Sequence, residues 1–231
     1  MKFLLLLLAG WLPALALAQP ATRYEINGYV KGLPDNAKLY LHDGPRRIDS
    51  ATVRQEHFTL RGHLAEPVFA YLYLGRGRGS SKLTDFLLDN RALTITGDKP
   101  EYNSVTISGS DINAQLNDWL QADQQLGHYR YEIGQVYKVL QARQDTTALP
   151  LQRIMQDIQQ GRVALLKAYV RRYHDSATGA ALPTLCTLSA SLTAADYTEM
   201  YQALTPNWQQ TAFGREILAQ AHKKGAAGPG K

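Results

Sequence analysis

The chain has 231 residues, of which 45% are hydrophobic and 19% charged, and its formal net charge is +5 at pH 7. This apolar content with so small a net charge excludes a chain that is disordered over most of its length. A single cysteine excludes an internal disulfide framework. The length suits one large domain or two smaller ones.

The first 18 residues, MKFLLLLLAGWLPALALA, have the order of a secretory signal peptide. Lys2 precedes the apolar run 3–12, Pro13 ends that run, and small residues lead to a predicted cleavage between Ala18 and Gln19. A membrane-spanning helix needs about 20 apolar residues, and this run is too short. We therefore expect an exported protein, in the periplasm or outside the cell, with no transmembrane segment after cleavage.

Residues 22–110 have the two-residue periodicity of β-strands, with turn signals between short apolar runs. Strands are predicted over 24–30, 38–41, 48–53, 57–64, 67–74, 84–88, 92–96 and 105–108. The runs 48–53 and 57–64 are expected to form a hairpin. Because no connection is long enough to contain a crossover helix, we expect a mainly antiparallel sandwich or open barrel.

At residue 111 the apolar spacing changes to that of amphipathic helices, and residues 111–222 are predicted to be a helical domain. The chain is therefore assigned to the α+β class. Ser110 or Asp111 is expected to cap the first helix, and Thr193 with Asp196 predicts a capping box. Helices are expected from 111 to about 145, from 151 to 173, and over 183–192, 194–204 and 206–222. Residues 223–231 are predicted to be a disordered tail.

The basic balance of the chain lies mostly at its two ends. Four of the 25 basic residues, Lys2, Lys223, Lys224 and Lys231, fall in the predicted signal peptide and tail, which leaves 21 basic against 20 acidic residues elsewhere. The predicted folded body is thus nearly neutral, and we expect no nucleic-acid partner.

No motif in the sequence indicates catalysis or metal binding. The six histidines lack the close spacing of zinc ligands, and there is no Gly-x-Ser-x-Gly elbow and no Cys-x-x-Cys. Cys186 stands among small and apolar residues and is expected to be buried and inert. We therefore expect a protein that is not an enzyme, with no catalytic residue, no metal and no cofactor.

The most conspicuous local segment is the glycine- and arginine-rich run 75–81, GRGRGSS. A phosphate-binding loop would have to lead into a helix, but a strand is predicted next, so a hairpin tip is favoured. Arg76 and Arg78 on this tip, with Tyr71 and Tyr73 on the strand before it, are the predicted contacts with a partner. Tyrosines in the strands are also suited to a groove for a sugar or a peptide.

Several short motifs occur in a characteristic order. They are YEINGYVKGLPD (24–35), KLYL (38–41), IDSATV (48–53), HFTLRG (57–62), FLLDN (86–90), LTITGD (93–98) and VTISGS (105–110). In this order they resemble the domain of unknown function at the N-terminus of many bacterial exported thioredoxin-like (thiol–disulfide oxidoreductase) proteins. The segments LTP (204–206) and TAFGREI (211–217) resemble the helical connector that such proteins place before the redox domain.

This resemblance implies the non-catalytic half of such a protein, because no Cys-x-x-Cys follows the connector, and Cys186 is not its equivalent. Three functions stay open. The first is an exported non-enzymatic module that binds a protein or another envelope partner. The second is an accessory that works with a separate thioredoxin-like protein, or a truncated remnant of a thiol–disulfide oxidoreductase. The third is a β domain that binds a small ligand, a sugar or a peptide.

Overall fold

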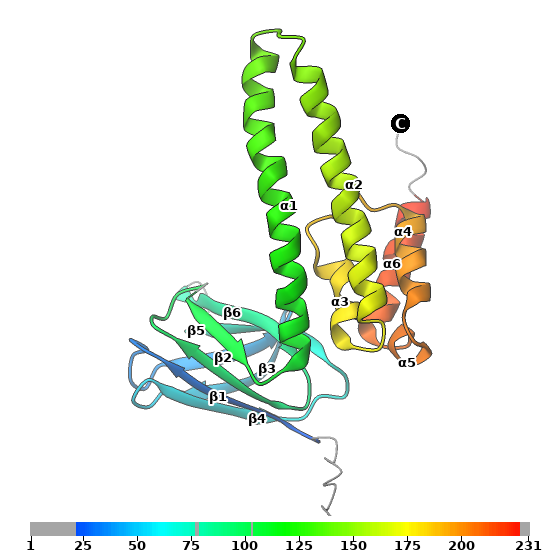
Figure 1. The fold of residues 1–231 in the computed structure, drawn as a ribbon. Helices are drawn as coiled ribbons and strands as arrows, with labels where there is room; N and C mark the ends of the chain where they lie inside the picture. The colour runs from blue at the N-terminus through cyan, green and yellow to red at the C-terminus, as the bar shows by residue number, and fades with distance from the viewer. Residues whose placement is uncertain (1–21, 77–78, 103, 227–231) are drawn as a thin grey trace, which may run out of the picture.

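The computed structural model describes residues 22–76, 79–102 and 104–226 (Figure 1). Within these ranges eight strands are followed by six helices, which confirms the predicted α+β class and the change of structure at Asp111. The predicted cleavage site between Ala18 and Gln19, and Arg78 in the predicted hairpin tip, lie outside the described residues. None of the helices in the described part of the chain combines the length and the apolar content needed to span a bilayer.

The strands form two four-stranded sheets that face each other and do not close into a barrel. One sheet has the order β4-β1-β7-β8, with β1 (Tyr24–Val30), β4 (His57–Gly62), β7 (Ala92–Gly97) and β8 (Val105–Ser108). The other has the order β3-β2-β5-β6, with β2 (Lys38–Asp43), β3 (Arg46–Thr52), β5 (Val68–Leu74) and β6 (Ser81–Leu88). Alternate side chains of both sheets, among them Ile26, Leu41 and Leu72, meet in one buried core.

One expectation about strand pairing is corrected, and the mainly antiparallel arrangement is confirmed. The predicted hairpin of β3 and β4 has a tight turn, with Gln55 and Glu56 both in the left-handed region, but the strands separate beyond the Arg54–His57 bridge. β3 pairs with β2 and β4 with β1, so this turn carries the chain from one sheet to the other. The pairing of β1 with β7 is parallel, while the other pairings are antiparallel. The parallel pairing of β1 with β7 needs no crossover helix, because the chain between them passes through the strands of the opposite sheet.

The helical region is dominated by a long antiparallel hairpin of two helices that projects away from the sandwich (Figure 1). It consists of α1 (Asp111–Ala142) and α2 (Ala148–Arg172). The shorter helices α3 (Ala177–Leu185), α4 (Ala194–Ala203), α5 (Pro206–Gln209) and α6 (Ala212–Ala226) gather at its base. A second buried core joins this base to the sandwich, since Leu87 of β6 packs in it with Trp119 of α1 and Leu182 of α3.

The third helix lies earlier than predicted, over Ala177–Leu185 instead of 183–192. Its residues from Ala177 to Pro183 are all buried, so the segment has no polar face and shows no helical periodicity in the sequence. Ser176 caps the helix by accepting the N–H of Gly179, and Pro183 lies inside it. The predicted start at Pro183 therefore lies near the C-terminal end of the observed helix.

The C-terminal helix also differs from its prediction. The segment 206–222 is two helices, because Thr211 accepts the N–H of Gly214 and starts α6 anew. Gly214 allows this close approach, since a Cβ there would lie 2.4 Å from the carbonyl oxygen of Trp208. The predicted tail is helical up to Ala226, where Lys224 donates to the carbonyl of Ser189 at 2.8 Å. Residues 227–231 lie outside the described residues.

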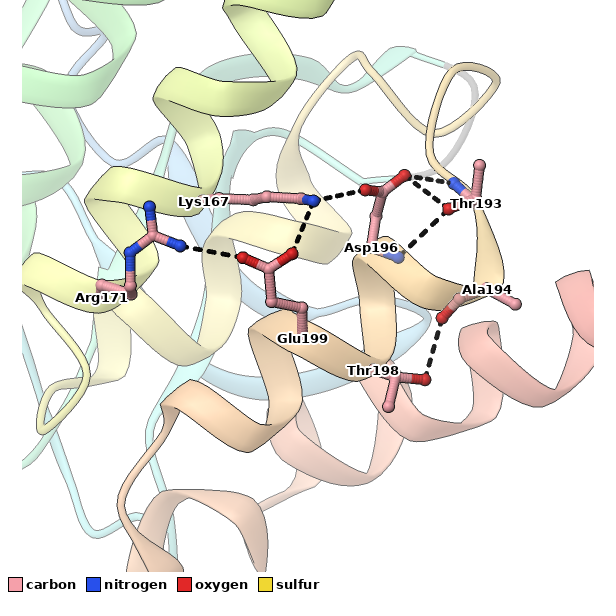
Figure 2. A network of polar contacts seen from close by, with 7 residues as sticks. All are labelled: Lys167, Arg171, Thr193, Ala194, Asp196, Thr198 and Glu199. Atoms are coloured by element: carbon pink, nitrogen blue, oxygen red, sulfur yellow. Dashed lines mark hydrogen bonds and ion pairs between the residues drawn. The ribbon is translucent and has the colours of Figure 1, made fainter.

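Polar contacts fasten α2 to α4 (Figure 2). The Lys167 ammonium lies 2.6 Å from Asp196 and 2.7 Å from Glu199, and Arg171 reaches the second oxygen of Glu199 at 2.9 Å. The predicted capping box of Thr193 and Asp196 is confirmed, with both of its bonds present. Ser110 occupies the N-cap position of α1, but its hydroxyl makes no capping bond.

Candidate functional site

Four aromatic side chains stand on the outer face of the sheet β3-β2-β5-β6. On β2, Leu39 and Leu41 point into the core, so Tyr40 and His42 point outward. On β5, Ala70 and Leu72 are buried in the same way, which turns Tyr71 and Tyr73 outward. We call the group Tyr40, His42, Tyr71 and Tyr73 the aromatic face.

Strand register brings these four residues together. β2 and β5 are neighbours, with Tyr40 opposite Tyr73 and His42 opposite Tyr71. The His42 and Tyr73 rings meet edge to face with centroids 5.6 Å apart, and the Tyr71 and Tyr73 rings are nearly parallel at 6.4 Å. The diagonal contact between β2 and β5 and the contact along β5 hold the rings in place. The result is a continuous aromatic surface across the two central strands.

One end of the aromatic face opens into a hollow of about 680 Å³, which we call the arginine hollow. Tyr40, His42 and Tyr73 line it together with Arg47 of β3 and Arg76 of the loop after β5. The Arg47 guanidinium lies 5.9 Å from the centroid of the Tyr40 ring. Among the described residues, no aspartate or glutamate lines the arginine hollow. It therefore combines apolar ring surface with positive charge.

The two arginines of the hollow differ from their neighbour Arg46. Arg46 forms an ion pair with Asp43 at 2.9 Å. Among the described residues, neither Arg47 nor Arg76 has a carboxylate partner. Guanidinium groups bind carboxylates and phosphates through two parallel hydrogen bonds. The arginine hollow is therefore suited to an anion.

The other end of the aromatic face borders a cleft of about 650 Å³ against the base of α1. Tyr71, Asp85 of β6, Tyr102 and Trp119 of α1 are among its lining residues. Lys82 lies 2.5 Å from Asp85 and 4.1 Å from the centroid of the Tyr102 ring. The Tyr102 hydroxyl donates to Asp85 at 3.2 Å. The cleft thus differs from the arginine hollow, because the positive charge beside the cleft, that of Lys82, is already paired with Asp85.

Two titratable groups at the cleft, Tyr71 and Lys82, have raised pKa values. Burial raises the pKa of Tyr71, and the negative charge of Asp85 raises it further. Burial tends to lower the pKa of Lys82, but the hydrogen bond and charge of Asp85 together with the contacts to Tyr102 outweigh burial, and the pKa is raised. Neither group exchanges a proton readily near neutral pH, so neither is suited to acid–base catalysis there.

The sequence-predicted contact residues fall into two places. Tyr73 and Arg76 line the arginine hollow, while Tyr71 lines the cleft, and Arg78 lies outside the described residues. Sequence reasoning did not find His42 and Arg47, and it included Tyr40 only among the strand tyrosines suited to a groove. Alternation along 38–43 places Tyr40 and His42 on one face, but only the register of β2 with β5 puts them beside Tyr73.

Cys186 is buried, as predicted, and its thiol donates to the carbonyl oxygen of Pro183 at 3.5 Å. Burial raises its pKa, so little of the reactive thiolate is present at neutral pH. Within the described ranges, no group of three or more His, Cys, Asp or Glu side chains is arranged to hold a metal ion.

Comparison with known proteins matches one part of the chain. Residues 24–116 match the family described as a domain of unknown function, DUF4369. This span runs from the first residue of β1 into the first turns of α1 and includes the aromatic face and the arginine hollow. No curated protein and no solved structure matches the chain. The strand-rich part of the chain is therefore similar to DUF4369.

Proposed function

We propose that this chain is an exported, non-enzymatic module that binds a protein or another envelope partner through the aromatic face. The arginine hollow carries the proposal. There Arg47 and Arg76, without carboxylate partners among the described residues, stand beside Tyr40 and Tyr73. Tyrosine and arginine are the side chains most enriched at binding surfaces, because they join a large apolar area to a polar group.

Binding is favoured over catalysis by the state of the groups around the aromatic face. The Asp85 carboxylate is occupied by Lys82 and Tyr102. The raised pKa of Tyr71 keeps its hydroxyl protonated. The thiol of Cys186 is buried away from this surface, in the helical core. Of these three groups, none is therefore an activated nucleophile or base.

Recovery of partners from an envelope extract tests the proposal. The tagged mature chain, which should begin at Gln19, is cross-linked in the extract and its partners are identified by mass spectrometry. The double variant Tyr40→Ala/Tyr73→Ala should lose the partner. Tyr129→Ala/Tyr131→Ala is the matched control, because these tyrosines are 61% and 62% exposed on α1, outside the aromatic face.

Circular dichroism melting first establishes that both double variants are folded. Loss of the partner in the first variant and its retention in the second supports the proposal. Equal recovery with both variants, or no partner above background with the unaltered chain, overturns it.

An accessory role is the narrower proposal, in which the partner is a separate thioredoxin-like protein. It is supported by the resemblance of the motifs in 24–110 and of the segments 204–206 and 211–217. Inspection of the neighbouring reading frames tests it, and it also tests whether the chain is a truncated remnant. Absence of a Cys-x-x-Cys protein there would remove the support for both.

A further inference from the structure

We propose that the arginine hollow binds a carboxylated sugar, a uronic-acid unit of an acidic oligosaccharide. The sugar ring would lie against Tyr40 and Tyr73, and its carboxylate would bind Arg47 and Arg76. This inference rests on the proposed function and names the ligand class for the same site.

The charge of the hollow selects for an anion. Arg47 and Arg76 line it, no acidic side chain does, and neither arginine has a carboxylate partner in the described part of the chain. Arg46, which is adjacent to Arg47 on β3, is by contrast neutralised by Asp43 at 2.9 Å. An anion that enters it gains charge-assisted hydrogen bonds without breaking an ion pair.

The ring surface of the hollow selects for a ligand with a flat apolar side. Tyr40 and Tyr73 are half-buried and stand opposite each other on neighbouring strands. Pyranose rings present C–H faces of about the size of a tyrosine ring, and amphipathic aromatic side chains suit such ligands. Arg47 lies over the Tyr40 ring. A carboxylate attached to the stacked sugar ring would therefore lie within reach of the guanidinium.

The topology argues against an extended peptide as the ligand. Peptides commonly bind sheets by adding a strand to a free edge. Here β2 and β5, which carry the tyrosines, are the two central strands of the sheet, so their backbone groups are paired on both sides. A volume of about 680 Å³ suits one or two sugar rings.

Calorimetric titration of the mature chain tests this assignment. The probe is trigalacturonic acid, and the comparison ligands are a neutral galactose trisaccharide and hexaglutamate. We expect trigalacturonic acid to bind about tenfold more tightly than either, and its affinity to fall as salt is raised. Arg47→Gln and Arg76→Gln should each weaken its binding by about tenfold. Arg46→Gln is the matched control and should leave its binding unchanged.

Two results overturn the inference: no binding of trigalacturonic acid, or binding of hexaglutamate as tight as that of the sugar. Equal weakening by Arg46→Gln and Arg47→Gln overturns the placement in the arginine hollow. The proposed function is tested separately, because cross-linking to an envelope partner that depends on Tyr40 and Tyr73 can succeed when the acidic sugar fails.

Discussion

The two ends of the α1–α2 hairpin are built in different ways. At its base, α1 buries Ile112, Leu116 and Trp119 against the second core, and Asp123 is also buried. Beyond Asp123, none of the described residues of α1 is buried. α2 shows the same division, since its buried residues are Leu166 and Val170 near the base and Ala148 alone near the tip.

The distal half of the hairpin is therefore held mainly by contacts between its two helices, with one hydrogen bond of 2.8 Å from Gln159 of α2 to the Ser191 hydroxyl before α4. Its inner side chains, such as Ile133 and Ile158, are only half-buried. Large apolar side chains on its outer surface are exposed, namely Tyr129, Tyr131, Val136, Val139, Leu149 and Ile154. Isolated helices are marginal in water. The buried base of the hairpin therefore contributes most of its stability. Substitutions at the base should lower the free energy of unfolding much more than substitutions at the tip.

The largest effect is expected from Arg162→Ala. Arg162 of α2 makes two hydrogen bonds of 2.7 Å to Asp123 of α1, and the two side chains are 12% and 8% exposed. Its removal leaves a buried carboxylate without a partner, which should cost about 3–5 kcal/mol in the free energy of unfolding. Urea denaturation followed by circular dichroism measures this loss.

The double variant Asp123→Leu/Arg162→Met serves as its control. An apolar pair of similar volume should recover most of the stability, because no buried charge is left unpaired. A single variant as stable as the unaltered chain would show that this ion pair does not hold the base of the hairpin.

The second prediction concerns Leu166→Ala, which removes a fully buried side chain of α2. The lost burial and the cavity left behind should reduce the free energy of unfolding by about 2–5 kcal/mol. The same urea experiment measures it, and an unchanged denaturant dependence would show that the folded state is otherwise intact. A loss below about 1 kcal/mol would mean that the core at the base is not tightly packed.

Local signals in the sequence predicted most of the strands and helices. The features that they did not predict depend on which strands pair across long distances in the sequence. Alternation located the strands, and the new apolar spacing after Ser110 located α1. Alternation does not specify the partner of each strand, so the sequence predicts a hairpin at the β3–β4 turn, where the two strands join different sheets. The predicted position of α3 is wrong by several residues, because a segment buried on every side has no amphipathic pattern.

The candidate site was likewise predicted where its residues are close in sequence and missed where they are brought together by strand pairing. Tyr71, Tyr73 and Arg76 were found because they are close in sequence and conspicuous in type. Tyr40 and Arg47 lie on two other strands, and their contribution depends on a register that periodicity does not specify. A site assembled on a sheet face is thus only partly visible in the sequence.

The third prediction concerns how the stability of the base of the hairpin depends on pH. Burial tends to raise the pKa of Asp196, but the bonds from Lys167 and Thr193 lower it more, and Lys167 also lowers the pKa of Glu199. A carboxyl with a lowered pKa stabilises the fold above its ordinary pKa of about 4. This stability is lost as the pH falls through the lowered value.

Lys167→Met should therefore cost about 1 kcal/mol at pH 7 and weaken the fall in stability between about pH 5 and pH 2. Urea denaturation across this range measures both effects. Lys138→Met is the matched control, because within the described residues Lys138 of α1 has no carboxylate partner. If the two variants gave the same pH profile, the contacts drawn in Figure 2 would not account for the acid sensitivity.

The smallest effect is expected from Leu149→Ala, which repeats on the distal part of α2 the substitution made at Leu166. Leu149 is 63% exposed, so little apolar burial is lost and the free energy of unfolding should change by less than about 0.5 kcal/mol. The paired urea curves of the two alanine variants measure the difference between tip and base directly. A loss of about 2 kcal/mol or more at Leu149 would contradict the comparison, because a side chain this exposed has no cavity to leave. The distal hairpin would then be covered in solution, and sedimentation of the unaltered chain would show whether a second copy covers it.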